Sequence, residues 1–309
     1  MSNTLVIKYN ESKVQNPNTE SGYPLNYHEN EDITLTITVK ASSANTFQIS
    51  ALNGTVTLTA SGGLYFTNSA YSTNAGTSKS IATGVTETVY LSSAGTLSIA
   101  HAQYVRTFIV GNNMSTSEFD LSQLHNMTNL SQFSWTNNWG VSGYIGGLRD
   151  SSGLTSLNLE STSANGDTST FKSLSGLTYL NISKSEIGGD VRHFANLTSL
   201  TTLILSSSGV HGSFYALRKL TNLTRCDIQS IPVYDTEYWN TTFNTTCTIN
   251  GTGAVNSGGS GGDAFTFKSD DSQYDQYLYA LTDSNGKVLA YYDNSGDFHI
   301  TGNIYAANL

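Results

Sequence analysis

Histidines, cysteines and serines are the side chains of this chain that could do chemistry, and their spacing argues against catalysis. The six histidines form no close pair and no HExxH motif, so no zinc site is indicated. No serine lies in a GxSxG motif. The two cysteines, Cys226 and Cys247, form no CxxC pair and cannot define a disulfide framework. We therefore expect no catalytic residue, no metal site and no cofactor.

One cluster of oxygen-bearing residues near the C-terminus could be taken for a calcium loop. Asp293, Asn294, Ser295 and Asp297 offer several ligand oxygens within five residues. The distal glutamate of a twelve-residue calcium loop is absent, however. The same residue types favour tight hairpin turns for backbone reasons alone. We therefore interpret this cluster as a turn.

The composition favours β-structure and excludes several classes of partner. Ser, Thr, Asn and Gly are abundant, and these residues disfavour long helices and favour turns. Only 12% of the residues are charged, the formal net charge is −9, and no run of Lys and Arg is longer than a pair. We therefore expect no nucleic-acid partner. No apolar stretch could span a bilayer, and no secretory leader is visible, so we expect no membrane insertion and synthesis in a cytoplasm, unless a leader was removed.

An internal repeat dominates residues 105–250. Motifs of the form LxxLxL begin at positions 105, 130, 154, 177, 200 and 223, at steps of 23 to 25 residues. Six registers in succession predict a solenoid, in which each short strand turns alternate apolar side chains into a shared core. The predicted core residues are Leu154, Leu157, Leu159, Leu177, Leu180, Ile182, Leu200, Leu203, Leu205, Leu223 and Ile228.

A small polar residue and then a glycine follow the strand motif in most repeats. The polar side chain can satisfy backbone groups where the coil turns away from the strand. The glycine permits a close backbone approach on the convex side. The polar residues are Asn113, Asn138, Thr162, Ser185 and Ser208, and the glycines are Gly143, Gly166, Gly189 and Gly212.

These repeats resemble the leucine-rich repeat family, in particular the variant that carries LxGxI after the strand. The resemblance covers residues 105–250 and implies a solenoid with a parallel concave β-sheet and a mostly non-helical convex side. It also implies that a ligand would bind to the outward side chains of the concave sheet. The candidate ligand-binding residues are Gln132, Ser134, Thr136, Ser156, Asn158, Glu160, Tyr179, Asn181, Thr202, Ile204, Arg225 and Asp227.

The candidate face is polar, which limits what it can bind or catalyse. It lacks the clusters of Trp, Tyr and Arg that are typical of protein-binding hot spots. A surface glycan is compatible with it, and a merely solvated sheet is the alternative. Glu160 and Asp227 lie three repeats apart, roughly 14 Å at the usual strand spacing, which is too wide for the two carboxylates of a glycosidase. Trp135 and Trp139 are expected to fill the core and rim of the first full repeat.

Further segments flank the solenoid on both sides. The sequence predicts an arm followed by β-strands for residues 1–50. For residues 51–104 it predicts a β-rich cap over the N-terminal end of the solenoid. The alternation of apolar and polar residues in this region indicates antiparallel sheet. Residues 251–262 are Gly-rich and predict a flexible linker. Residues 263–309 predict a small β-meander, whose apolar surface favours a homo-oligomer, with a trimer as the expected state.

The C-terminal segment DSNGKVLAYYDNSGDFHITGNIY resembles short hairpin modules of bacteriophage head and tail fibres. With the polar repeat and the missing leader, this resemblance implies a non-enzymatic virion structural protein of a tailed bacteriophage. Its partners would be other virion proteins, and its repeat would attach to a host glycan or surface protein. The alternative is a bacterial cell-surface adhesin whose leader was removed, because the repeats also resemble surface proteins of gut Bacteroidetes. An intracellular scaffold is disfavoured by the low charge.

Overall fold

The computed structural model describes a solenoid with a β-sheet cap and, separately, a set of C-terminal strands. The described residues are 32–40, 45–69, 74–110, 114, 117–234, 236 and 247–251, with the strands at 266–267, 277–282, 288–293 and 298–300. The predicted arm before residue 32 and the predicted linker after residue 251 lie outside the described residues.

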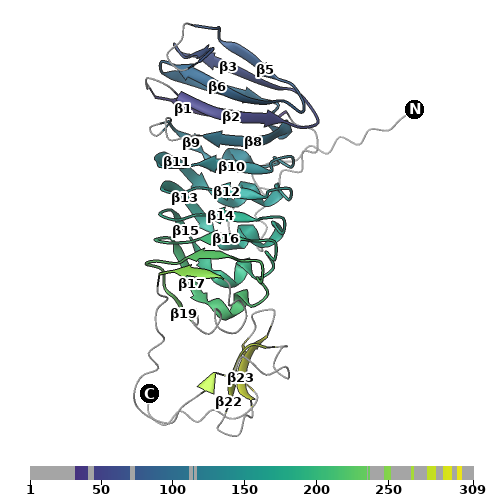
Figure 1. Cartoon of the computed structure of the whole chain (residues 1–309), viewed down its shortest axis with the longest axis vertical. Coiled ribbons are helices and arrows are strands. Elements are labelled where there is room, and N and C mark those ends of the chain that lie inside the picture. Colours follow the sequence, from purple (N-terminus) through teal and green to yellow (C-terminus); the bar gives the residue numbers. More distant parts are fainter. Residues whose placement is uncertain are drawn as a thin grey trace, which may run out of the picture. The chain divides into compact units, whose positions relative to one another are not determined.

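Each coil of the solenoid contributes one short strand to a long parallel array (Figure 1). The strands pair in register, so that Leu157, Leu180 and Leu203 lie beside one another on neighbouring strands. The last strand lies one period after its predecessor and closes the array. The strands are β8 (Val105–Val110), β10 (Gln132–Trp135), β12 (Ser156–Asn158), β14 (Tyr179–Asn181), β16 (Thr202–Ile204), β18 (Arg225–Asp227) and β20 (Thr248–Asn250).

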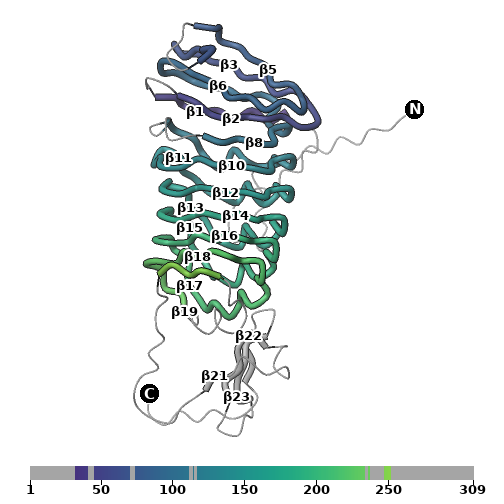
Figure 2. Tube along the Cα trace, in the orientation of Figure 1, coloured from purple at the N-terminus to yellow at the C-terminus, as the bar shows by residue number. Residues whose placement is uncertain are grey.

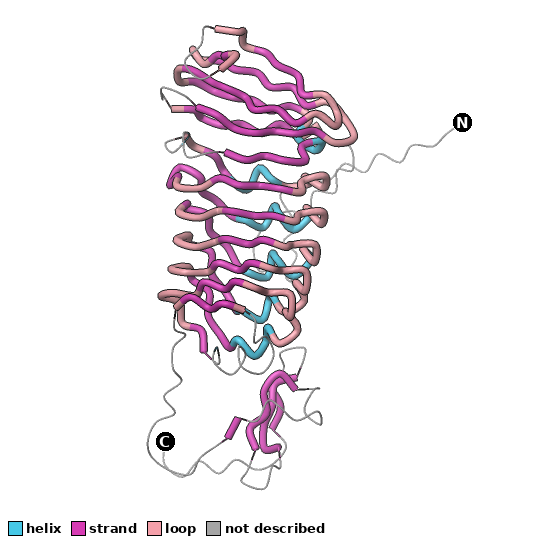
Figure 3. The backbone as a smooth tube through the Cα atoms, in the orientation of Figure 1, coloured by secondary structure: helices cyan, strands magenta, loops and turns pink. Residues whose placement is uncertain are grey.

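A second parallel sheet of six strands runs along the convex side of the coils, which the sequence left unspecified (Figure 3). Its strands are β9 (Phe119–Asp120), β11 (Asn138–Tyr144), β13 (Thr162–Asp167), β15 (Glu186–Asp190), β17 (Gly209–Ser213) and β19 (Val233–Tyr234). Each strand of this sheet except β19 leads into a short 3₁₀ helix. These are η3 (Leu121–Leu124), η4 (Ile145–Asp150), η5 (Thr168–Ser173), η6 (Val191–Phe194) and η7 (Phe214–Leu217). Within the described residues, no helix has the length and apolar character needed to cross a membrane.

The repeated glycines stand where the second sheet turns into the 3₁₀ helices. Gly143, Gly166, Gly189 and Gly212 all have positive φ angles, between 92° and 126°. L-residues with a Cβ rarely adopt this conformation. At Gly189 a Cβ would also overlap Thr168 Oγ1 and Asp167 Oδ2 of the preceding coil. The glycines are thus required by their positive φ and by close side-chain atoms of the preceding coil, rather than by the close backbone approach expected from the sequence.

The repeated polar residues satisfy backbone groups, as predicted. Asn138 Nδ2 donates to the carbonyls of Met114 and Ser117, both at 2.8 Å, and its Oδ1 accepts from Gly140 N. In later repeats the hydroxyl donates to the carbonyl three residues earlier. These bonds are Thr162 to Leu159 at 2.8 Å, Ser185 to Ile182 at 2.6 Å and Ser208 to Leu205 at 2.6 Å. Asn113 lies outside the described residues.

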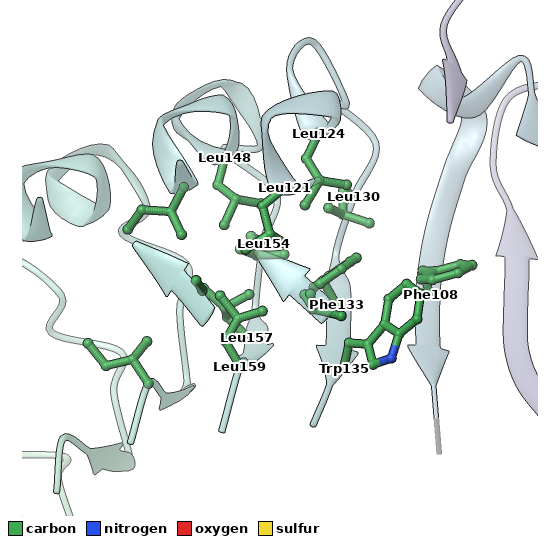
Figure 4. Close-up of a cluster of buried hydrophobic side chains, with 14 of the residues drawn as sticks. Phe108, Leu121, Leu124, Leu130, Phe133, Trp135, Leu148, Leu154, Leu157 and Leu159 are labelled. Carbon is green, nitrogen blue, oxygen red and sulfur yellow. The ribbon is translucent and has the colours of Figure 1, made fainter. Parts of the chain in front are cut away.

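The core of the solenoid is filled by the predicted residues, all eleven of which are fully buried. Leucines of the 3₁₀ helices, such as Leu121 and Leu148, gather with the strand leucines (Figure 4). At the N-terminal end of the solenoid, aromatic rings fill the core in place of leucines. The ring centroids of Phe108 and Trp135 lie 6.0 Å apart. Trp135 is buried as expected, whereas Trp139 is 62% exposed, because it lies on the outward side of β11 rather than in the core.

The cap is an antiparallel β-structure, as predicted, and it joins the solenoid through a shared sheet. β2 (Asn45–Ala51) pairs antiparallel with β8, and β6 (Thr86–Ser92) and β4 (Tyr65–Thr67) follow, which extends the solenoid sheet to ten strands. A second, four-stranded sheet contains β1 (Thr34–Val39), β7 (Gly95–Ala100), β3 (Val56–Ser61) and β5 (Ser78–Ile81). We expected residues 51–104 to cover the N-terminal end of the solenoid. The strand that pairs with β8 is β2, however, and it begins before residue 51.

The first coil also closes the edge of the four-stranded sheet. Thr38 and Glu118 exchange two backbone hydrogen bonds, of 2.9 and 2.8 Å. The side-chain amide of Gln123 makes the two backbone hydrogen bonds that a neighbouring strand would make. Its Oε1 accepts from Thr36 N at 2.7 Å, and its Nε2 donates to Thr36 O at 3.1 Å. The short helix η1 (Ala102–Tyr104) links the cap to β8. The stacking of cap and coils can be followed along the chain trace (Figure 2).

The C-terminal strands form the predicted β-meander. β21 (Thr266–Phe267), β22 (Tyr277–Thr282), β23 (Val288–Asp293) and β24 (Phe298–Ile300) pair antiparallel in chain order. The turn residues Asn294 to Asp297 lie outside the described residues. The oligomer expected for residues 263–309 stays a prediction.

Candidate functional site

The outward side chains of the ten-stranded sheet form two straight rows, which we call row 1 and row 2. Each row passes through registered partners on nine strands, from β6 in the cap to β20. Row 1 consists of Thr86, Ser50, Thr107, Gln132, Ser156, Tyr179, Thr202, Arg225 and Thr248. Row 2 consists of Thr88, Gln48, Ile109, Ser134, Asn158, Asn181, Ile204, Asp227 and Asn250.

Ten of the twelve predicted ligand-binding residues lie in these rows. Of the other two, Thr136 directly follows β10, and Glu160 is the second residue after β12. The structure therefore places all twelve on one side of the sheet. Three of them are less accessible than expected: Asn181 is 3% exposed, and Ile204 and Asp227 are each 8% exposed. All three lie in row 2. That any of the twelve contacts a ligand stays a prediction.

Asn181 organises the first of two polar clusters on this face. Its Nδ2 donates to Glu160 Oε2 at 3.2 Å, and its Oδ1 accepts from Ser183 N and Ser183 Oγ at 3.0 and 2.7 Å. The other oxygen of Glu160 lies 3.8 Å from Lys184 Nζ. Asn158, one strand earlier, accepts in the same way from Glu160 N. The cluster is thus held in place by its own hydrogen bonds.

Asp227 organises the second cluster, two coils after Asn181. Its nearly buried carboxylate requires partners. Arg225 supplies two: Nε donates to Oδ1 at 3.3 Å and Nη2 donates to Oδ2, while Asn250 Nδ2 also donates to Oδ1. The hydrogen bonds and charge of Asp227 raise the pKa of Arg225. The guanidinium is half exposed, so it is presented to solvent in a fixed orientation.

Neither cluster has the geometry of a hydrolase. Between Glu160 and Asp227 stand the strands β14 and β16, which gives a separation of three strand spacings, roughly 14 Å. Each carboxylate is also engaged with its own donors. The cysteines offer no nucleophile either, because both are buried and burial raises the pKa of Cys247 to about 11.

A histidine cluster on the convex side was not expected from the sequence. His193 Nδ1 lies 2.8 Å from Thr168 Oγ1 and 3.6 Å from Asp167 Oδ1. A catalytic triad needs the nucleophile and the carboxylate on opposite ring nitrogens, whereas here both face one nitrogen. The Thr168 hydroxyl also donates to the Asp190 carbonyl at 3.1 Å. Burial lowers the pKa of His193. This cluster therefore ties neighbouring coils together.

Two features of the face were missed by sequence reasoning. The cap residues Ser50, Gln48, Thr86 and Thr88 continue the rows, and only the strand pairing reveals this. A ladder of threonines also borders row 1, where each Oγ1 donates at 3.0 Å to the carbonyl one coil earlier. Its signal was present in the repeated Leu-Thr pair. The ladder residues are Thr155, Thr178, Thr201 and Thr224. No group of metal-binding side chains occurs in the part of the chain that is described.

The repeat geometry, with one registered strand, one buried polar turn residue and one turn glycine per coil, defines a leucine-rich repeat solenoid. No protein-family model and no curated protein matches the sequence. Among solved structures, an internalin from Listeria monocytogenes is 21% identical, with a TM-score of 0.38 over 43% of this chain and 38% of that one.

Plant receptors are also similar to part of the chain. The ectodomain of the receptor kinase SOBIR1 from Arabidopsis thaliana is 18% identical, with a TM-score of 0.35 over 40% of this chain and 69% of that one. The plant peptide hormone receptor RGFR1, solved in complex with RGF2, is 21% identical, with a TM-score of 0.34 over 37% of this chain. This match spans only 19% of the receptor.

Proposed function

We propose that this protein is a non-enzymatic binding protein whose ten-stranded sheet holds a surface glycan. The observation that carries the proposal is the pair of polar clusters on one face, around Asn181 and Asp227, whose side chains are fixed by mutual hydrogen bonds. Fixed donors and acceptors lose little conformational entropy on binding. Hydroxyl-rich ligands such as sugars can use both kinds of group.

Tyr179 lies on β14, the same strand as Asn181, and gives the proposed site its aromatic surface. It occupies row 1 two strands from Arg225, with Thr202 between them. An aromatic ring offers a large contact area together with a polar hydroxyl. We infer that Tyr179 is the central contact of the glycan.

A glycan array with the purified protein tests this function. We expect binding of one glycan class, and loss of at least about tenfold in affinity for Tyr179→Ala, the factor that corresponds to 1.4 kcal/mol. Trp139→Ala is the matched control, because it removes an exposed aromatic side chain outside the two rows. An array without any bound glycan would contradict the proposal, and so would equal losses in the two variants.

We further propose that the protein works on the outside of a particle or cell. Its first setting is the virion of a tailed bacteriophage, as a head or tail fibre or decoration subunit with other virion proteins as partners. The antiparallel meander of β21 to β24 beyond a Gly-rich segment supports this setting. The alternative setting is a bacterial cell surface. Mass spectrometry of purified phage particles decides between them, because a virion subunit must be present in stoichiometric amounts.

A further inference from the structure

The binding face does not end with the leucine-rich repeats. β8 pairs on one side with β10 and on the other with β2, so row 2 passes directly from Ile109 to Gln48 and on to Thr88. Row 1 passes likewise from Thr107 to Ser50. Registered partners share a face of a sheet, whether the pairing is parallel or antiparallel. The rows therefore extend unbroken over nine strands, roughly 38 Å at the usual strand spacing.

In the cap, row 2 is accessible and uncharged. Gln48 and Thr88 are both exposed, and they are direct partners across β2 and β6. Tyr90 lies beside them on β6, half buried, with Thr46 and Thr67 as its partners. Amide, hydroxyl and phenol groups thus continue the polar chemistry of the solenoid rows.

The charged residues of rows 1 and 2 indicate what charge a ligand of this face should carry. Arg225 and Asp227 are the only charged members of the two rows, and they neutralise each other as an ion pair. Glu160, next to row 2, is faced by Lys184. The two rows thus have no net charge, although the whole chain carries −9. A polyanion needs unpaired cations along its path, and none is arranged along these rows.

The same rows do not suit a protein partner. Protein hot spots are built from Trp, Tyr and Arg anchors in desolvated pockets. Of these residue types, rows 1 and 2 contain only Tyr179 and Arg225, and Arg225 is already paired with Asp227. A long, uncharged array of hydrogen-bonding groups instead matches a long, uncharged ligand rich in hydroxyl groups.

We propose that Gln48 and Thr88 belong to the ligand site, and that its occupant is an uncharged linear polysaccharide lying across the strands from β18 to β6. This inference rests on the proposed glycan-binding function and goes beyond it in two ways. It adds a binding segment in the cap, outside the repeats. It also fixes the ligand class as neutral and extended rather than acidic or compact.

Calorimetry with polysaccharide fragments of two lengths tests the proposal. The probes are neutral glucans, mannans and galactans, each as a tetrasaccharide and as a fragment longer than the sheet, with polygalacturonate as the acidic counterpart. We expect the long neutral fragment to bind at least tenfold more tightly than the tetrasaccharide. Its affinity should change less than twofold between low and high salt, because no ion pair forms with the ligand.

The double variant Gln48→Ala/Thr88→Ala locates the cap segment. Both residues are exposed, so the variant keeps its fold. We expect about tenfold weaker binding of the long fragment, as for one or two lost hydrogen bonds, and unchanged binding of the tetrasaccharide. The matched control is Thr59→Ala/Ser98→Ala, a registered pair on the outward side of the four-stranded sheet. Tyr179→Ala should weaken both fragments.

Each contrary outcome has its own meaning. Wild-type affinity of the double variant for the long fragment would overturn the cap segment while leaving the glycan site in the solenoid. Salt-dependent binding of polygalacturonate alone would overturn the neutral ligand class. Failure of every fragment to bind would overturn the proposed function, and this inference with it.

Discussion

At the residue scale, the inward and outward positions of one strand differ sharply in what they contribute to stability. Leu203 is fully buried and stacks on Leu180 of the previous coil, whereas its neighbour Thr202 faces outward. We expect Leu203→Ala to lower the free energy of unfolding by about 2–5 kcal/mol. Thr202→Ala should lower it by no more than about 0.5 kcal/mol. Urea unfolding of the two variants measures both values, and equal stabilities would contradict the repeat register.

His193 makes the stability of the solenoid depend on pH. Burial, and next the charge of Lys172, lower the pKa of His193 below its ordinary value of 6.5. The unfolded chain then binds a proton more readily than the folded one, so stability is fully present above about pH 6.5 and falls as the pH drops through the folded pKa. Asp167 acts in a separate window, because its lowered pKa lies below 3.8.

Urea midpoints at pH 7.5 and pH 5.5 measure this dependence. The midpoint of the wild type should fall at the lower pH, and His193→Gln should remove most of the difference. His211→Gln changes an exposed histidine on β17 and serves as the control. A His193→Gln variant with the full wild-type pH dependence would show that another group is responsible.

At the scale of the elements, the turn from the second sheet into each 3₁₀ helix depends on one glycine. Gly189 has φ of 126°, and a Cβ there would overlap atoms of Thr168 and Asp167. We expect Gly189→Ala to cost about 1–3 kcal/mol in unfolding free energy. Gly153→Ala is the control, since its nearest neighbours would lie 3.8 Å away. Thermal melts compare the two, and a Gly189→Ala variant as stable as the control would refute this role.

The repeating strands of the solenoid could be predicted from the sequence, whereas the pairing of a cap strand with the first solenoid strand could not. The spacing of Leu154, Leu177 and Leu200 fixed the strand register, because one residue type recurred at one interval. The burial of Asn181 and Asp227 was missed, because exposure within a sheet depends on the side chains of neighbouring strands. The junction of β2 with β8 was also missed, since alternation shows that a strand has two faces but not which strand lies beside it.

At the scale of the whole molecule, we expect cap and solenoid to unfold as one cooperative unit. They share the ten-stranded sheet and a single hydrophobic core, in which the ring centroids of Phe47 and Phe108 are 5.2 Å apart. We expect Phe47→Ala to destabilise the protein by about 3–5 kcal/mol in one transition. Tryptophan fluorescence, to which the buried Trp135 contributes together with Trp139 and Trp239, and far-UV circular dichroism should give the same midpoint. Two separate transitions, with only one shifted, would show that the cap folds independently.

The shared sheet gives the molecule a single continuous face, and the central claim is that this face holds the ligand. A crystal structure of the protein with the long neutral polysaccharide fragment tests it most directly. We expect the sugar chain to lie across the strands, in contact with Tyr179 in the solenoid and with Gln48 in the cap. A sugar chain bound to the six-stranded sheet or to the 3₁₀ helices, with both rows left empty, would contradict it.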